Sequence, residues 1–130
     1  MTNREKKIIV ANWKMNPQTL AEARRIFGLA KRTSMKIRRA TAVICPPFIY
    51  LSTLAKSAKG AHNISLGVQN LFWETAGSYT GEISPTMVLN AGAKYAIIGH
   101  SERRTLGETD LMVSKKAALA LKLGLRVIVC

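Results

Sequence analysis

The fold is decided by residues 95–104, which read YAIIGHSERR. Residues 95–98 form an apolar run with no polar alternation, which is typical of a strand buried on both faces of a parallel sheet. A glycine and a histidine follow, and then Ser101 and Glu102 resemble the first turn of a short helix. The stretch therefore predicts a buried strand that ends in a polar turn.

The same pattern recurs outward in both directions along the chain. Apolar runs rich in Ile and Val occupy residues 8–11, 41–45, 64–68 and 126–130, and amphipathic stretches separate them. The runs recur every ~30 residues, which is the size of a strand–helix–strand unit. The order predicts an α/β fold of about five parallel strands and four helices.

Four helices are expected from their terminal signals. In the first, Leu20, Ala23, Phe27 and Ala30 recur on one face. The first helix is expected to begin with Asn16 as its cap and Pro17 in the first helical position. The other three are expected to begin at Pro47, at Ser84 with Pro85, and at Thr109, and to end at Gly60, Gly92 and Gly124, respectively.

Two architectures are compatible with this order of elements: an open doubly wound sheet and a (β/α)8 barrel. The first strand-to-helix turn reads Asn12-Trp13-Lys14-Met15-Asn16 and contains no G-x-G-x-x-G. The dinucleotide-binding version of the open sheet therefore loses support.

The chain has 130 residues, is 48% hydrophobic and carries a net charge of +13. Such a charge favours anionic partners, but the cations form no single tract, so we interpret them mainly as solvated faces and regard nucleic-acid binding as a minor hypothesis. They are spread over Arg24, Arg25, Lys31, Arg32, Lys36, Arg38, Arg39, Lys56, Lys59, Lys115 and Lys116.

The N-terminus and the two cysteines bear on the location of the protein and on metal binding. The polar, basic N-terminus is followed by no apolar stretch that resembles a signal peptide or is long enough to span a membrane, so a cytoplasmic location is expected. Cys45 and Cys130 form no CxxC pair and are too few for a zinc site. Both fall at expected strand ends, so buried free thiols are predicted.

Polar side chains at the carboxyl ends of the strands are the candidate site, because α/β folds of either architecture place their sites there. Lys14, just after the first strand, would neutralise an anionic substrate, although a surface lysine is an alternative. His100, after the fourth strand, lies beside a helix N-terminus, whose partial positive charge disfavours a protonated imidazole. The neutral ring would still donate a hydrogen bond to a carbonyl oxygen; a structural histidine in a salt-bridge cluster is the alternative.

The connection from Gln69 to Glu82 is long for this position. Its aromatic residues Phe72, Trp73 and Tyr79 suggest a partner surface if they are exposed. The alternative is a loop that folds its aromatics onto its own barrel.

Four motifs in this order resemble the triosephosphate isomerase family: Asn12-Trp13-Lys14-Met15-Asn16, Gly67-Val68-Gln69-Asn70, Tyr79-Thr80-Gly81-Glu82-Ile83-Ser84 and Ile98-Gly99-His100-Ser101-Glu102-Arg103-Arg104. The resemblance implies a (β/α)8 TIM barrel that interconverts dihydroxyacetone phosphate and glyceraldehyde 3-phosphate in glycolysis and gluconeogenesis. It implies neither a metal nor an organic cofactor. The loop at residues 105–111 looks about one residue shorter than usual, and Leu111 stands where a glutamate is common.

The resemblance also implies residue roles. Lys14 would bind the substrate and stabilise its developing charge, Asn12 would help to position it, and His100 would be the neutral electrophile. Glu102 would support Lys14. In the family's homodimer, Thr75 would approach the partner's active site, and Glu82 and Arg103 would pair across the interface.

By this resemblance residues 1–130 would be the N-terminal half of a TIM barrel, with the C-terminal half absent. The family's catalytic glutamate, mobile lid and phosphate loops belong to that other half, so the chain alone is expected to be inactive. Open edges on the first and fifth strands are also expected. Two alternatives are a non-catalytic phosphate-ligand module and, less favoured, a basic nucleic-acid-binding scaffold.

Overall fold

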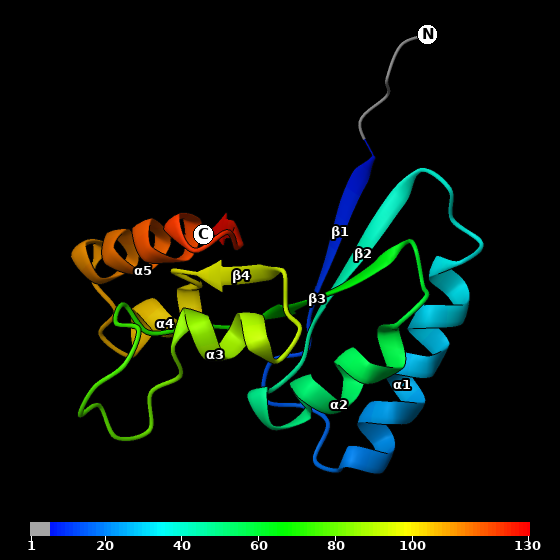
Figure 1. Ribbon diagram of the computed structural model, residues 1–130, viewed down its shortest axis with the longest axis horizontal. Helices are drawn as coiled ribbons and strands as arrows, with labels where there is room; N and C mark the ends of the chain where they lie inside the picture. Colours follow the sequence, from blue (N-terminus) through cyan, green and yellow to red (C-terminus); the bar gives the residue numbers. More distant parts are fainter. Residues whose placement is uncertain (1–5) are drawn as a thin grey trace, which may run out of the picture.

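The computed structural model describes residues 6–130, which form five strands and five helices (Figure 1). The strands are β1 (Lys7–Asn12), β2 (Ala40–Cys45), β3 (Ile64–Val68), β4 (Tyr95–Ile98) and β5 (Arg126–Val129). The helices are α1 (Leu20–Ser34), α2 (Phe48–Ala58), α3 (Pro85–Asn90), α4 (Ser101–Thr105) and α5 (Asp110–Lys122). The fifth helix is α4, the short helix directly after His100 whose first turn Ser101 and Glu102 indicated in the sequence.

All strands are parallel, and their order in the sheet is β1-β2-β3-β4-β5. A doubly wound sheet would reverse this order at a switch point. Here every right-handed crossover advances in one direction, so the helices collect on one face and the sheet curls toward a barrel. The predicted partial (β/α)8 barrel is confirmed, and the open sheet was the wrong alternative.

The main core lies between the sheet and its helices. Phe27 from α1, Leu54 from α2 and Ile98 from β4 are almost fully buried there. A second, smaller cluster on the opposite face of the sheet contains Val43, Cys45, Tyr95 and Ile97. Two buried faces explain why the middle strands show little polar alternation.

The edges of the sheet differ from the expectation of strands buried on both faces. In β1, Ile8 is 53% exposed and Ile9 is 54% exposed, and Val129 in β5 is 59% exposed. Each of these strands has a neighbour on one side only. The open edges predicted for the first and fifth strands are therefore confirmed.

Three local predictions about these elements can be compared with the structure. Helix α1 begins after Thr19, whose side chain accepts from the amide of Glu22, so the predicted start at Asn16–Pro17 was wrong by one turn. The caps at Ser84 and Thr109 are confirmed. Cys45 is buried, but Cys130 is exposed because it follows the edge strand β5.

No helix within residues 6–130 has the length and apolar character needed to cross a membrane.

Candidate functional site

The carboxyl ends of β1, β3 and β4 surround one pocket of about 270 Å³. Its lining residues are Asn12, Lys14, Met15, Pro47, Phe48, Gln69, Asn70, His100, Glu102 and Arg103. The structure thus brings together Asn12, Lys14, His100 and Glu102, which the sequence singled out. The size suits a small metabolite, because drug-sized ligands occupy larger cavities.

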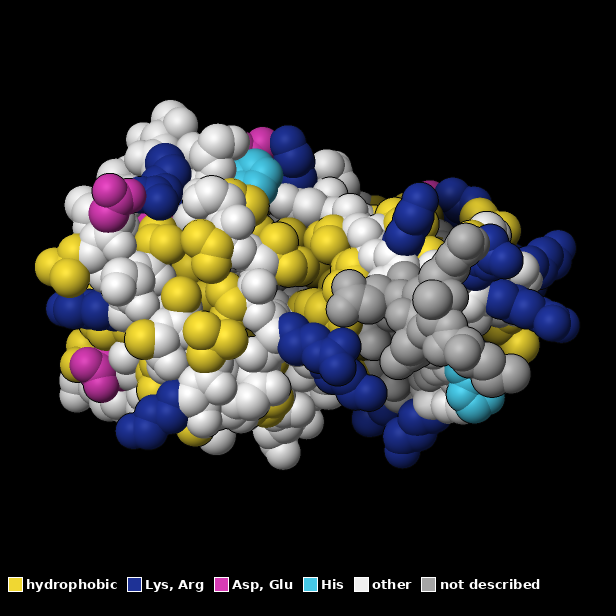
Figure 2. All heavy atoms as spheres, turned by 90° about the horizontal axis from the view of Figure 1, so that it is seen from above, with side chains coloured by type: hydrophobic (Ala, Val, Ile, Leu, Met, Phe, Trp, Pro, Cys, Tyr) yellow, Lys and Arg dark blue, Asp and Glu magenta, His cyan; other side chains and the backbone are white. Residues whose placement is uncertain are grey.

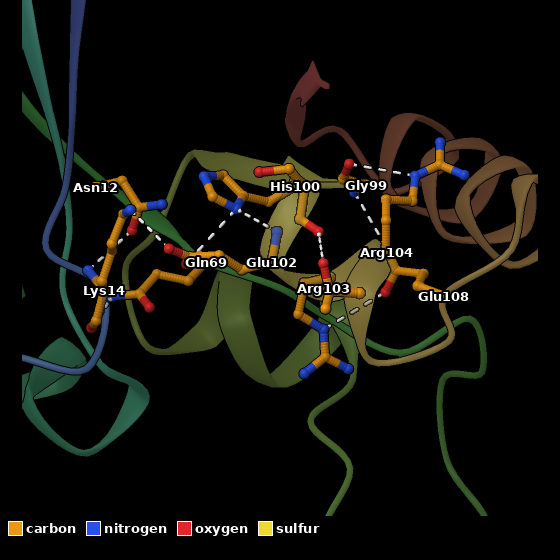
Figure 3. Close-up of polar contacts among 11 residues, drawn as sticks. Asn12, Lys14, Gln69, Gly99, His100, Glu102, Arg103, Arg104 and Glu108 are labelled. Carbon is orange, nitrogen blue, oxygen red and sulfur yellow. Dashed lines mark hydrogen bonds and ion pairs between the residues drawn. The ribbon is translucent and has the colours of Figure 1, made fainter.

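Lys14 is held in an unusual backbone conformation at the end of β1. Its φ angle is 58°, in the left-handed region that residues other than glycine seldom adopt. The Asn12 side-chain oxygen accepts from the Lys14 amide at 2.9 Å, and the Gln69 side chain donates to the Lys14 carbonyl at 2.8 Å. These two bonds fix the turn that directs the Lys14 side chain into the pocket (Figure 3).

The Lys14 ammonium forms an ion pair with Glu102 on α4, with 2.6 Å between Nζ and Oε1. The hydrogen bond from Lys14, together with the charge of its ammonium, lowers the pKa of the Glu102 carboxyl. Glu102 is therefore ionised near neutral pH. About half of each side chain remains exposed, so an anionic ligand entering the pocket has access to the ammonium.

His100 caps the N-terminus of α4 with its ring. The Nδ1 atom accepts a hydrogen bond from the Glu102 amide at 3.2 Å. An acceptor nitrogen carries no proton, so in the neutral ring the proton is on Nε2. His100 therefore presents an N–H donor to a ligand in the pocket that it lines.

A buried ion pair supports the turn that carries His100. The Glu108 carboxylate accepts from the backbone amide of Gly99 at 3.1 Å and pairs with the ammonium of Lys116 at 2.5 Å. Burial alone would raise the pKa of Glu108, but the hydrogen bond from Lys116 and the charges of Lys116 and Arg103 lower it. Lys116 also donates to Asn70, another pocket residue.

Two of these supporting residues were missed or misread in the sequence. Gln69 appeared there only as part of a motif, yet its amide also donates to the Cys45 carbonyl and so links the ends of β1, β2 and β3. Its position directly after the buried strand β3 was the available signal. Lys116 was interpreted as a solvated cation, which was wrong, because its side chain is only 5% exposed.

The three residues predicted for a dimer interface lie in different surroundings. Thr75 and Glu82 are exposed in the long loop after β3. Arg103 lies on α4 with its Nε 3.6 Å from a carboxylate oxygen of Glu108 in its own chain. That nitrogen is buried and donates to no atom of the described residues.

The long loop after β3 combines the two alternatives considered for it, an exposed partner surface and aromatic residues folded inward. Phe72 is buried, and its ring packs at a tilt against those of Trp73 and Tyr79, with ring-centroid distances of 4.2 and 4.7 Å. The loop therefore folds its aromatics together, while Tyr79 remains 45% exposed.

A metal centre would need at least three clustered His, Cys, Asp or Glu side chains, and residues 6–130 contain no such group.

Comparison with known proteins identifies the family. The family model for triosephosphate isomerase matches residues 7–130. The triosephosphate isomerase of Moorella thermoacetica is 48% identical over 124 residues, which cover 95% of this chain and 49% of that protein. Those of Thermoanaerobacter sp. strain X514 and Nitratidesulfovibrio vulgaris strain Hildenborough are 47% and 44% identical, with 49% and 51% of their own lengths covered.

The chain thus spans about half the length of the curated relatives that it matches. The match runs through all five strands and includes both Lys14 and His100. The chain belongs to the triosephosphate isomerase family.

Proposed function

We propose that these residues supply the N-terminal half of the active site of a triosephosphate isomerase, which interconverts dihydroxyacetone phosphate and glyceraldehyde 3-phosphate. One observation supports this most directly: Lys14 from the end of β1 and His100 from the end of β4 line the same pocket. The pocket thus combines a cation for a phosphorylated substrate with a donor for its carbonyl oxygen.

In this proposal Lys14 binds the anionic substrate. Its ammonium neutralises the phosphate and the negative charge that develops on the substrate oxygens. Asn12 helps to position the substrate and also holds the Lys14 turn through the bond to its amide. Glu102 supports Lys14 through the 2.6 Å ion pair, which restricts where the ammonium points.

His100 acts as the neutral electrophile. A proton on Nε2 would donate to the substrate carbonyl oxygen as it gains charge on the way to the enediolate. Because Nδ1 accepts from the Glu102 amide at the start of α4, the neutral ring carries its proton on Nε2, on the nitrogen left to face the ligand. The triosephosphate isomerase family is itself the standard example of a neutral histidine electrophile, which supports this proposed role.

The described pocket lacks a free carboxylate to abstract the substrate proton. Its one acidic lining residue is Glu102, which is paired with Lys14. A placed base typically contributes ~10²–10⁴ in rate. We therefore infer that a polypeptide consisting of these 130 residues has almost no isomerase activity until a segment carrying the base joins it.

We further infer that the complete enzyme is a cytoplasmic homodimer. The exposed loop bearing Thr75 and Glu82 supports the homodimer, because its aromatic rings pack on one another and leave polar residues exposed to a partner. The Arg103 side chain is 42% exposed beside the pocket, so part of its guanidinium is open to a partner's loop.

The test is reconstitution of the two halves. The 130-residue chain is co-expressed with the half of the Moorella thermoacetica enzyme that lies beyond the matched region, and isomerisation is followed in a coupled assay. We expect almost no activity from either half alone and measurable activity from the pair. Lys14→Met and His100→Gln should each reduce the activity of the pair at least 100-fold.

Lys115→Met is the matched control, because Lys115 is an exposed lysine outside the pocket. It should leave activity within twofold. Near-normal isomerisation by the chain alone would contradict the missing base, and an active pair carrying Lys14→Met would contradict the proposed site.

A further inference from the structure

The fold separates the charges of the chain in a way that the sequence does not reveal. In a parallel sheet, the loops that lead from strands into helices lie at one end, and the loops that return from helices to strands lie at the other. Every Asp and Glu among residues 6–130 belongs to the first end, in loops after strands or in the first turns of helices. They are Glu22, Glu74, Glu82, Glu102, Glu108 and Asp110.

The opposite end is bordered by cations. Eight exposed Lys and Arg residues lie there, outside all helices, at the starts of strands or in the loops that lead to them; we call them the basic rim. They are Lys6, Lys7, Lys36, Arg38, Arg39, Lys59, Lys94 and Arg126. Seen from above, Lys and Arg side chains crowd the right half of the molecule, where β1 to β3 begin in Figure 1 (Figure 2).

Helix dipoles do not account for the basic rim. Cations in the last turn of a helix stabilise its negative end, which explains Lys31, Arg32, Lys56 and Lys122. The residues of the basic rim are in no helix. None of them forms an ion pair with a carboxylate of the described residues.

The backbone also brings basic residues of different segments into adjacent positions. The Lys7 amide donates to the carbonyl of Arg39, and the Arg126 amide donates to the carbonyl of Lys94. Adjacent like charges repel, which costs stability. Two such pairs with no acid beside them among the described residues leave a positive potential that an anionic partner would neutralise.

The shape of the basic rim favours a linear polyanion. Five neighbouring strands about 4.8 Å apart extend the edge over roughly 20 Å, so one small anion would leave most of the cations unpaired. A membrane surface is less suitable, because membrane-binding faces combine cations with a helix face of large apolar residues. Here the exposed apolar residues of the adjoining loop are Met35 and Ile37, and no helix carries them.

We propose that the basic rim binds the phosphodiester backbone of nucleic acid without reading its sequence. Aromatic stacking, which supports base recognition, is absent there: Tyr95, beside Arg126, is buried and uses its hydroxyl to accept from that guanidinium at 2.7 Å. The proposal concerns the end of the sheet opposite the isomerase pocket and is independent of the proposed function.

The test is binding of a 20-nucleotide fluorescent single-stranded oligonucleotide to the 130-residue chain, followed by anisotropy at several salt concentrations. The logarithm of the binding constant should fall linearly with the logarithm of salt, with about 0.7 in slope for each phosphate contact. Lys36→Gln with Lys94→Gln should lower the magnitude of the slope by about 1.4. Oligonucleotides of different sequence should bind within about threefold of one another.

Arg24→Gln with Lys115→Gln is the matched control, because it removes the same charge from exposed sites away from the basic rim. It should leave the slope nearly unchanged. Equal weakening by both double variants would overturn the proposal, since net charge alone would then explain binding. Stronger binding to phosphatidylserine vesicles than to the oligonucleotide at equal salt would also overturn it.

A second measurement needs no variant and so does not depend on variant folding. Lysine acetylation of the unmodified chain, read by mass spectrometry, should show Lys7, Lys36 and Lys94 protected by the oligonucleotide and Lys115 unprotected. Equal protection of all four would contradict a localised site.

Discussion

The Lys14 ammonium and the Glu102 carboxylate lie 2.6 Å apart, although 88 positions separate the two residues in the chain. The contact joins the end of β1 to the short helix α4 and so ties the two halves of the pocket together. Because the pKa of Glu102 is lowered by this bond, the pair stays intact at neutral pH and weakens as the pH falls through the lowered pKa.

Glu102→Gln should reduce the activity of the reconstituted enzyme about tenfold, because the Lys14 ammonium loses its charged partner and samples more orientations. The melting temperature should change little, since exposed ion pairs contribute little to stability. Steady-state kinetics and thermal melting measure the two effects. Unchanged kinetics, or a large loss of stability with normal kinetics, would contradict the supporting role.

The backbone of Lys14 allows a paired comparison. A left-handed conformation costs residues other than glycine roughly 1–2 kcal/mol, and Lys14 has φ 58°. Lys14→Gly should therefore be about 1 kcal/mol more stable to urea than Lys14→Ala, because only glycine adopts the turn without strain. Equal stability of the two variants would show that the turn is unstrained.

The buried pair of Glu108 and Lys116 should be costly to break. Glu108→Gln leaves the Lys116 ammonium without its buried partner, and breaking such a pair typically costs about 3–5 kcal/mol of unfolding free energy. Because the folded pKa of Glu108 is lowered, its contribution is fully present above the ordinary carboxyl pKa. It is lost as the pH falls through the lowered folded value.

Urea unfolding at pH 7 and at successively lower pH tests both statements. The difference between the native chain and Glu108→Gln should be constant near neutrality and should narrow in acid, below the ordinary carboxyl range. The double variant Glu108→Gln with Lys116→Met should lose less than the sum of the single variants. Strict additivity would contradict direct coupling.

The open edges of the sheet should make the isolated chain associate. Ile8 and Ile9 in β1 are each more than half exposed, on a strand with an unpaired side. Ile9→Lys should raise the concentration at which light scattering detects aggregates several-fold. Leu106→Lys is the control, because Leu106 is 77% exposed but lies in a turn, and it should have little effect.

The two cysteines should differ in reactivity. Burial raises the pKa of the Cys45 thiol to about 12, so almost no thiolate forms at pH 8. Cys130 is exposed. Iodoacetamide at pH 8 should therefore modify Cys130 alone within minutes, as read by peptide mass spectrometry, and Cys45 only after unfolding in urea. Equal labelling of both in the native chain would contradict the burial of Cys45.

The sequence by itself determined the order of the elements. The unalternated apolar runs marked all five strands to within about a residue, and Ser84 and Thr109 marked helix starts, because buried strands and helix caps are local requirements. The rule that sites lie at the carboxyl ends of strands singled out Asn12, Lys14 and His100, which line one pocket in the structure. The start of α1 was missed because Pro17 and Thr19 are both acceptable local signals, and only the packing of the chain selects one.

The tertiary structure alone decided which distant side chains meet. It paired Lys14 with Glu102, placed the Gln69 amide under the Lys14 carbonyl, and buried Lys116 against Glu108. It also exposed β1, since a strand needs neighbours on both sides to be buried. Cations scattered along the sequence gather at one end for the same reason: burial, pairing and the clustering of charge depend on contacts between segments, and no local pattern encodes them.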